Sequence, residues 1–172
     1  MAAVAAAKAA GFTTRYDRGV SRTIAPGVAL LASAWLLLVV AAPSLAAPLA
    51  GVLYATGSLI CHQLPERSFH LQGFQLPVCA RCLGIYGGAA VGSVAGAAAV
   101  GRRMLAWWRQ PASRSVNWIV TAVAASPTLA TFVLEWGFGW PISNAVRAIA
   151  ALPVGFAVAF VVVSALATLH YE

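Results

Sequence analysis

All three cysteines of this chain lie between positions 61 and 82, next to a histidine. Thiolate and imidazole are common protein ligands of zinc, copper and iron. Cys79 and Cys82 are separated by two residues, a spacing that lets both sulfurs reach one ion. Cys61 and His62 would complete a four-ligand shell from the other end of the loop. The pattern therefore predicts a transition-metal site, with zinc favoured and copper or iron as alternatives.

The same cysteines also fit thiol–disulfide chemistry. Arg81 lies between Cys79 and Cys82, and Cys79 is expected near the N-terminus of a helix, so that both features favour a thiolate. In an oxidising compartment, Cys79 and Cys82 with Cys61 as a third exchanging thiol would make a membrane oxidoreductase. A third interpretation is a disulfide or a metal that only holds the loop in shape. The sequence assigns no catalytic residue.

Other polar side chains are candidates for a shell around the cysteines or for a polar cavity. Glu135, Asn144 and Arg147 lie near the boundaries of apolar stretches, where a charged residue is costly unless it is paired. The short turn between them can bring Glu135 and Arg147 together on the side of the cysteines, as one ion pair or as the border of a cavity. The remaining candidates are Gln63, Glu66, Arg67, His70, Arg81 and Tyr86.

The elements that must position these residues are membrane-spanning helices. Of 172 residues, 61% are hydrophobic and only 9% are charged, whereas a soluble domain has roughly 25% charged residues. This composition excludes a soluble globular enzyme and a nucleic-acid binder of the usual kind. The sequence contains no nucleotide-binding glycine loop, serine-nucleophile elbow or haem-attachment motif.

Four stretches are long and apolar enough to cross a bilayer, which takes about 20 residues. The predicted spans are 24–42, 82–100, 118–134 and 145–169. Leu49–Ile60 is too short to cross, and we expect it to form an interfacial or re-entrant helix before the Cys/His loop. A motif at 44–46 resembles a signal-peptide cleavage site, but the preceding apolar run is long for one. We therefore expect an all-α polytopic membrane protein, a bundle of about four transmembrane helices that forms a single domain over 24–169.

Basic residues are distributed unevenly along the chain and predict its orientation. Most of the 11 Lys and Arg residues lie in the N-terminal tail, 1–23, and in the loop between the second and third spans. An excess of Lys and Arg marks the cytoplasmic side. Both termini are therefore expected in the cytoplasm, and the Cys/His loop, 61–81, on the extracytoplasmic face of a bacterial inner membrane. The net charge of +7 follows from these flanks and indicates no nucleic-acid partner.

Glycines recur every four residues in the second predicted span, at Gly84, Gly88, Gly92 and Gly96. This spacing leaves one helix face without side chains, so that another backbone can approach closely. We expect a close helix–helix seam, within the monomer or with a second copy or a larger membrane complex. An accessory subunit of such a complex, in which the Cys/His loop only keeps its shape, is therefore an alternative function.

The run CHQLPERSF, followed by QLPVCARCLGIYGG, resembles the signature of a family of uncharacterised predicted bacterial and archaeal membrane proteins, a domain of unknown function. A later element, Ser143-Asn144-Ala145-Val146-Arg147, also fits, although its acidic partner is Glu135 where we expect Asp. The resemblance covers about 25–168 and implies no activity. It marks Cys61, His62, Gln63, Glu66, Arg67, Cys79, Arg81, Cys82, Tyr86, Asn144 and Arg147 as the positions of interest. The residues themselves predict a small integral membrane protein with an extracytoplasmic metal site.

Overall fold

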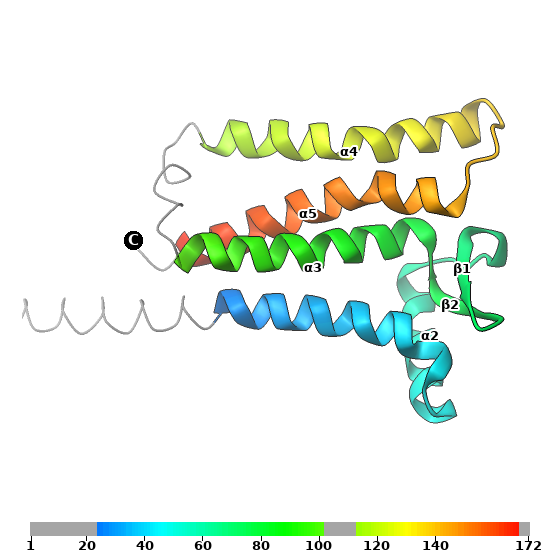
Figure 1. Ribbon diagram of the computed structural model, residues 1–172. Coiled ribbons are helices and arrows are strands. Elements are labelled where there is room, and N and C mark those ends of the chain that lie inside the picture. The colour runs from blue at the N-terminus through cyan, green and yellow to red at the C-terminus, as the bar shows by residue number, and fades with distance from the viewer. Residues whose placement is uncertain (1–23, 102–112, 169–172) are drawn as a thin grey trace, which may run out of the picture.

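The computed structural model describes residues 24–101 and 113–168, which are predominantly helical (Figure 1). Four helices in these ranges are long and apolar enough to cross a membrane. They are the first helix (Ile24–Ser44, whose end is the 3-10 turn η1, Ala42–Ser44), α3 (Ala80–Gly101), α4 (Ser113–Gly137) and α5 (Asn144–Thr168). The polytopic helical architecture is therefore confirmed. The basic tail 1–23 and residues 102–112, on which the predicted orientation depends, lie outside the described residues.

A shorter apolar helix, α2 (Ala47–Ile60), follows the first helix. Its 14 residues extend over about 21 Å at the usual helical rise, which is less than the roughly 30 Å of a bilayer core. In Figure 1, α2 lies at the same end of the molecule as the two strands. A second 3-10 turn, η2 (Pro65–Arg67), connects this region to the first strand.

Helices α3 and α5 pack with their backbones in direct contact. A Cβ atom on most of the regularly spaced glycines of α3 would collide with a carbonyl oxygen of α5. The pairs are Gly84 with Ala148, Gly88 with Leu152 and Gly92 with Phe156, and Gly96 faces the side chain of Val163. Gly155 of α5 makes the reciprocal approach to Ile85. The glycine face is thus a seam inside the monomer, which is one of the two predicted arrangements. Because α5 occupies this face, it is not free for a second copy or a complex.

Helix α4 lies against α5, on the side away from α3 (Figure 1). The Thr128 hydroxyl donates to the carbonyl oxygen of Ala150 at 2.8 Å and links the two helices. Pro127 has no N–H, so the carbonyl of Val123, four residues earlier, loses its helical partner. The Ser126 hydroxyl donates to that carbonyl at 2.7 Å. The helix therefore continues through the proline to Gly137.

A short antiparallel hairpin, β1 (Ser68–Leu71) and β2 (Phe74–Cys79), lies between α2 and α3. The sequence predicts a Cys/His loop here, so the hairpin is an addition to the predicted all-α class. Gln72 and Gly73 at its turn have φ angles of 54° and 83°, which is typical of a two-residue turn matched to the twist of the strands. Cys79 is the last residue of the hairpin and directly precedes α3, which begins at Ala80.

Amide and hydroxyl groups fasten α2 to the hairpin. The side-chain nitrogen of Gln63 donates to the carbonyl oxygens of Tyr54 and Pro77, each at 2.8 Å. The Tyr54 hydroxyl donates to the carbonyl oxygen of Gln75, whose own side chain donates to the Ser68 hydroxyl at 3.2 Å. These hydrogen bonds fix the segment after α2, and with it Cys61, against the strand that ends at the other cysteines.

Candidate functional site

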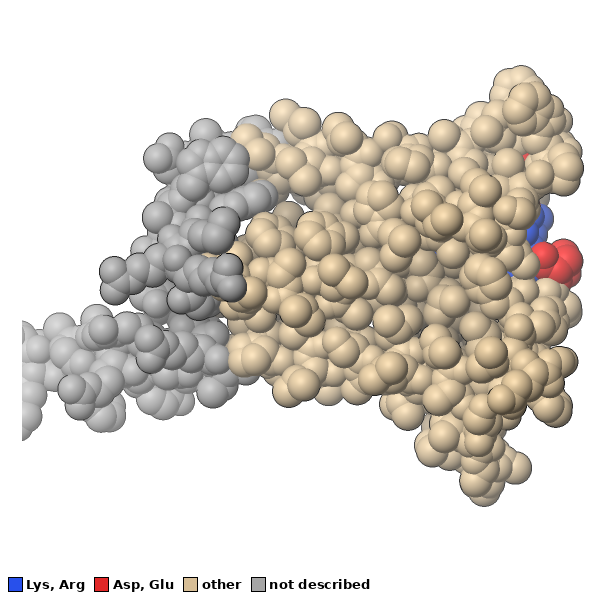
Figure 2. Space-filling view, in the orientation of Figure 1, with Lys and Arg blue, Asp and Glu red and all other residues tan. Residues whose placement is uncertain are grey.

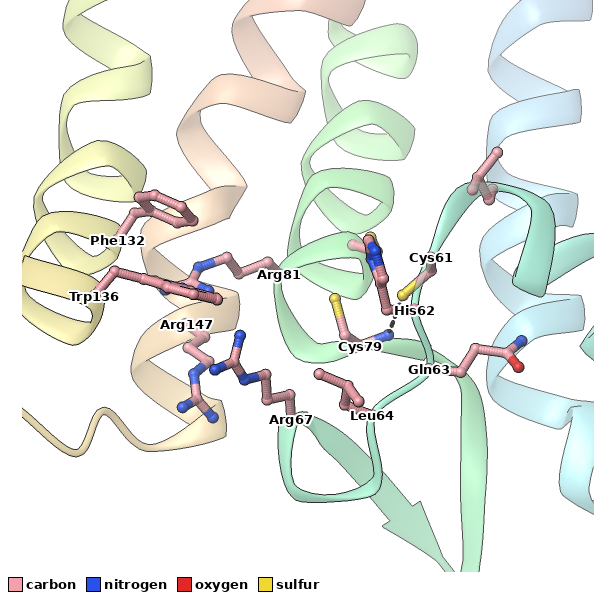
Figure 3. A pocket seen from close by; sticks show the side chains of 12 residues that line it. Cys61, His62, Gln63, Leu64, Arg67, Cys79, Arg81, Phe132, Trp136 and Arg147 are labelled. Atoms are coloured by element: carbon pink, nitrogen blue, oxygen red, sulfur yellow. Dashed lines mark hydrogen bonds between the residues drawn. The ribbon is translucent and has the colours of Figure 1, made fainter. Parts of the chain in front are cut away.

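The sulfur atoms of Cys61, Cys79 and Cys82 all lie within 4.8 Å of one another. Cys61 caps the C-terminus of α2, Cys79 ends β2, and Cys82 lies in the first turn of α3. In Figure 3 the side chains of Cys61 and Cys79 lie beside each other, and the Cys79 amide donates to the Cys61 sulfur at 3.1 Å. All three are free thiols. Three elements therefore bring together the sulfurs that the sequence analysis grouped as ligands.

The surroundings of Cys79 favour its thiolate. Cys61 is buried in an apolar cluster with Val39 and Val78. A hydrogen bond from the Cys82 thiol, assisted by backbone N–H groups at the start of α3, lowers the pKa of Cys79 to about 5 although burial opposes this shift. The lowered pKa favours the thiolate of Cys79, which is the state that binds a metal or attacks a disulfide.

Several predicted partners of the cysteines lie elsewhere. His62 is exposed and lines the neighbouring pocket, but its imidazole is not part of the group of close ligand atoms. His70 is exposed on β1, and Glu66 is exposed in η2. Tyr86, in contrast, stays beside the cysteines: it packs against the buried cluster of Val39, Cys61 and Val78. Its ring lies edge-to-face on Trp35 of the first helix, with ring centroids 6.0 Å apart. Within the described residues, the close group thus consists of three thiols, and ligation by His62 stays a prediction.

Glu135, near the C-terminal end of α4, binds three arginines. Its carboxylate oxygens lie 2.7 Å from Arg81, 2.8 Å from Arg147 and 3.2 Å from Arg67. Of these three contacts, only the one with Arg147 is predicted from the sequence. Arg67 and Arg81 come from η2 and α3, so one carboxylate connects the loop, α3, α4 and α5. Three positive charges meet one negative charge, and no second carboxylate pairs with these arginines in the described ranges.

Asn144 joins this charged group to the hairpin. Its side-chain oxygen accepts a hydrogen bond from Arg147 at 2.6 Å, and its side-chain nitrogen donates to the carbonyl oxygen of Ser68 at 3.0 Å. Both contacts depend on the position of Asn144 at the first residue of α5. Asn144 thus orients Arg147 toward Glu135 and holds the hairpin over the end of α5.

A pocket of about 390 Å³ separates the cysteines from the arginines. Figure 3 shows Arg67, Arg81 and Arg147 on one side, with Phe132 and Trp136 beyond them, and Cys61 and Cys79 on the other. The full lining is Ile60, Cys61, His62, Gln63, Leu64, Arg67, Cys79, Arg81, Cys82, Phe132, Trp136 and Arg147. Gln63 reaches this lining, but its side-chain nitrogen is bound to the backbone of α2 and β2.

Two aromatic residues of the pocket, Phe132 and Trp136, are not among the site residues predicted from the sequence. Phe132 and Trp136 stack on each other, with ring centroids 5.8 Å apart. The Arg67 guanidinium lies 5.2 Å from the Trp136 ring centroid, and that of Arg81 lies 5.7 Å from the ring centroid of Phe132. The available signal was the spacing of Phe132, which lies three residues before Glu135 and four before Trp136, because residues three and four positions apart share a helix face.

The charged side chains that the structure describes gather at one end of the helices. Figure 2 shows blue and red atoms together at this end, while the remaining described surface on this side is uncharged. An apolar body with four helices of spanning length defines an integral membrane protein with several transmembrane helices. The chain belongs to the family described as "Predicted membrane protein (DUF2085)", which matches residues 61–161. That match includes the cysteines, the arginines and Glu135.

Two archaeal relatives match shorter segments. The uncharacterized protein MJ1492 of Methanocaldococcus jannaschii is 60% identical over 42 residues, which are 24% of this chain and 27% of that protein. An uncharacterized protein of Methanothermobacter thermautotrophicus is 60% identical over 30 residues, 17% of this chain and 27% of its own length. The chain thus matches about a quarter of each of these relatives. No solved structure matches the chain.

Proposed function

We propose that this protein is a membrane metal-binding protein in which Cys61, Cys79 and Cys82 bind one transition-metal ion, most favourably zinc. The observation that carries the proposal is the approach of all three sulfurs to within 4.8 Å of one another. Zn–S bonds of about 2.3 Å in a tetrahedral site place the sulfurs about 3.8 Å apart. Small side-chain movements would therefore bring the three sulfurs to this spacing. Copper(I) and iron–sulfur chemistry use the same soft ligands and are the alternatives.

Three thiolates leave one position of a tetrahedral ion for a fourth ligand. A fourth protein ligand would close the site and make the metal structural, whereas water or a substrate in that position would permit catalysis. His62 lines the pocket beside the sulfurs and is the predicted fourth ligand. Its exposure favours an open site, in which water or a substrate in the pocket is the fourth ligand.

Metal content tests this proposal directly. The purified protein, prepared without chelators under reducing conditions, should contain about one metal ion per chain. Cys79→Ser should lose most of it, because a hydroxyl is a much poorer ligand than a thiolate. Elemental analysis by mass spectrometry measures both, and His70→Ala, on the exposed strand, serves as the control that should keep its metal. His62→Ala distinguishes a closed site, which it would weaken, from an open one.

The metal proposal is wrong if the reduced wild-type protein contains no stoichiometric metal and binds none when zinc or copper(I) is added. A melting temperature measured on each variant shows that a loss of metal is not simply a loss of the fold. Equal metal content in the wild type and Cys79→Ser would also contradict the proposal.

A second candidate function is thiol–disulfide exchange, which the low pKa of Cys79, about 5, favours. The Cys79 thiolate would attack a substrate disulfide and release one substrate thiolate, which takes up a proton. Cys82 would then lose its proton, displace the second substrate thiol and form a Cys79–Cys82 disulfide, so that two electrons pass to the substrate. Alkylation before and after reduction distinguishes this function: cysteines that are permanently reduced and metal-bound in native membranes contradict it.

We also propose that the cysteine end of the molecule faces away from the cytoplasm, as the basic tail and basic loop indicate. A thiol reagent that cannot cross membranes should then label Cys61, Cys79 or Cys82 in intact cells after reduction and metal removal. The readout is the mass shift of the purified protein. Labelling only after cell lysis would show that this end lies in the cytoplasm.

A further inference from the structure

We propose that the pocket beside the cysteines binds the phosphate head of an amphiphilic molecule, such as an anionic lipid. The first observation is charge. Arg67, Arg81 and Arg147 surround a single carboxylate, so that the group carries a formal excess of two positive charges at the end of an apolar bundle. Glu66 is exposed and forms no ion pair with them. An anion that enters the pocket would offset this excess.

The second observation is the number of donors that the carboxylate leaves free. Each guanidinium has five N–H groups, and Glu135 offers two oxygens. The Nε atom of Arg81 is buried and has no hydrogen-bond partner among the described residues, and a buried donor without a partner is costly. Phosphate oxygens accept two parallel hydrogen bonds from one planar guanidinium group. The N–H groups that Glu135 leaves free would donate such bonds to a phosphate.

The third observation is the apolar part of the wall. Ile60, Leu64, Phe132 and Trp136 contribute apolar side chains to the lining. A volume of about 390 Å³ lies in the usual range for small-molecule pockets, roughly 300–1,000 Å³, and exceeds what a phosphate ion alone would fill. These walls therefore suit a phosphate carried on an apolar body, at the end of spanning helices where lipid headgroups lie.

This inference does not rest on the proposed metal site. The phosphate would bind the arginines, which are on the opposite side of the pocket from the sulfurs (Figure 3). Binding should therefore persist after a chelator has removed any metal. A loss of phosphate binding on chelation would place the anion on the metal and overturn the inference, while the metal proposal would stand.

The test uses the full-length protein in bilayer discs of phosphatidylcholine and counts bound lipids by native mass spectrometry. Phosphatidic acid at a low mole fraction should bind as one molecule per chain, and Arg67→Gln should weaken it about tenfold, the effect of one lost charge-assisted contact. Arg67 is the most exposed of the three arginines, with 28% of its side chain accessible, so the variant should fold. Arg67→Lys, which keeps the charge, should retain more binding than Arg67→Gln.

Arg103→Gln removes the same charge from a part of the chain outside the described residues and is the matched control. Equal loss in Arg103→Gln and Arg67→Gln would show a general charge effect and overturn the inference, as would unchanged binding in Arg67→Gln. A parallel titration with inorganic phosphate identifies the source. Saturable binding of phosphate itself, sensitive to Arg67→Gln, would support the anion site with a free phosphate as its ligand; binding of neither ligand would overturn it.

Discussion

Replacing Glu135 with glutamine should destabilise the protein by about 3–5 kcal/mol, the usual cost of removing one partner from a buried ion pair. Only 10% of the Glu135 side chain is exposed, and its carboxylate lies within 3.2 Å of three guanidinium groups. Glutamine has nearly the same shape but no charge, so the three arginines would repel one another at close range. Thermal unfolding of the purified protein in mild detergent measures the loss.

Glu66→Gln provides the matched control, because it makes the same chemical change one residue before Arg67. Glu66 is exposed and takes part in no ion pair in the described residues. Its replacement should change the free energy of unfolding by no more than about 0.5 kcal/mol. Glu135→Asp keeps the charge and should be less damaging than Glu135→Gln. Equal stability of Glu135→Gln and Glu66→Gln would mean that the carboxylate of Glu135 does not hold the arginines together.

Gly88→Ala should have the second largest effect, a loss of about 1–3 kcal/mol, which is typical of overpacking. A methyl group at Gly88 would collide with the carbonyl oxygen of Leu152 and also approach the backbone nitrogen of Phe156 at 2.8 Å. Backbone atoms in the middle of a helix cannot move aside as a flexible side chain can. Helix α5 would therefore have to move away from α3 along the whole seam.

Gly51→Ala is the control for this prediction, since it adds the same methyl group to another helix. Beyond the neighbouring residues and backbone of its own helix, nothing lies within 4 Å of the position of a Cβ on Gly51. Because alanine is the better helix former by about 1 kcal/mol, this variant should be as stable as the wild type or more stable. Denaturant titration of both variants measures the difference. A destabilised Gly51→Ala together with an unaffected Gly88→Ala would refute the described packing of α3 on α5.

The helices and the seam were largely predictable from the sequence. Helix positions follow from long apolar runs, since a chain in lipid must satisfy its backbone hydrogen bonds within each segment. The four-residue spacing of glycines in α3 predicted a close backbone contact, because it leaves one face of the helix without side chains. The partner, α5, was not predictable, because Gly155 is a single glycine whose approach to Ile85 leaves no periodic signal.

The hairpin was missed because its signals are short. Gln72 and Gly73 form a two-residue turn in which only glycine is a strong indicator. Pro77 lies inside β2, and a proline argues against a strand except at an edge. Both strands of a two-stranded sheet are edges, so Pro77 is tolerated there. That exception becomes visible only once the pairing is known.

The sequence by itself determined which residues are candidates for chemistry. With 9% charged residues and three cysteines, the chain has few such side chains, and they lie in one loop and near one helix boundary. The tertiary structure decided how they combine. It brought three sulfurs together while leaving His62 outside their group, and it placed Arg67 and Arg81 on Glu135, where the sequence indicated only Arg147. Sequence spacing limits how far apart two residues can lie, but the direction of a side chain depends on the elements that pack around it. Here the end of α2, the hairpin and three helices set those directions.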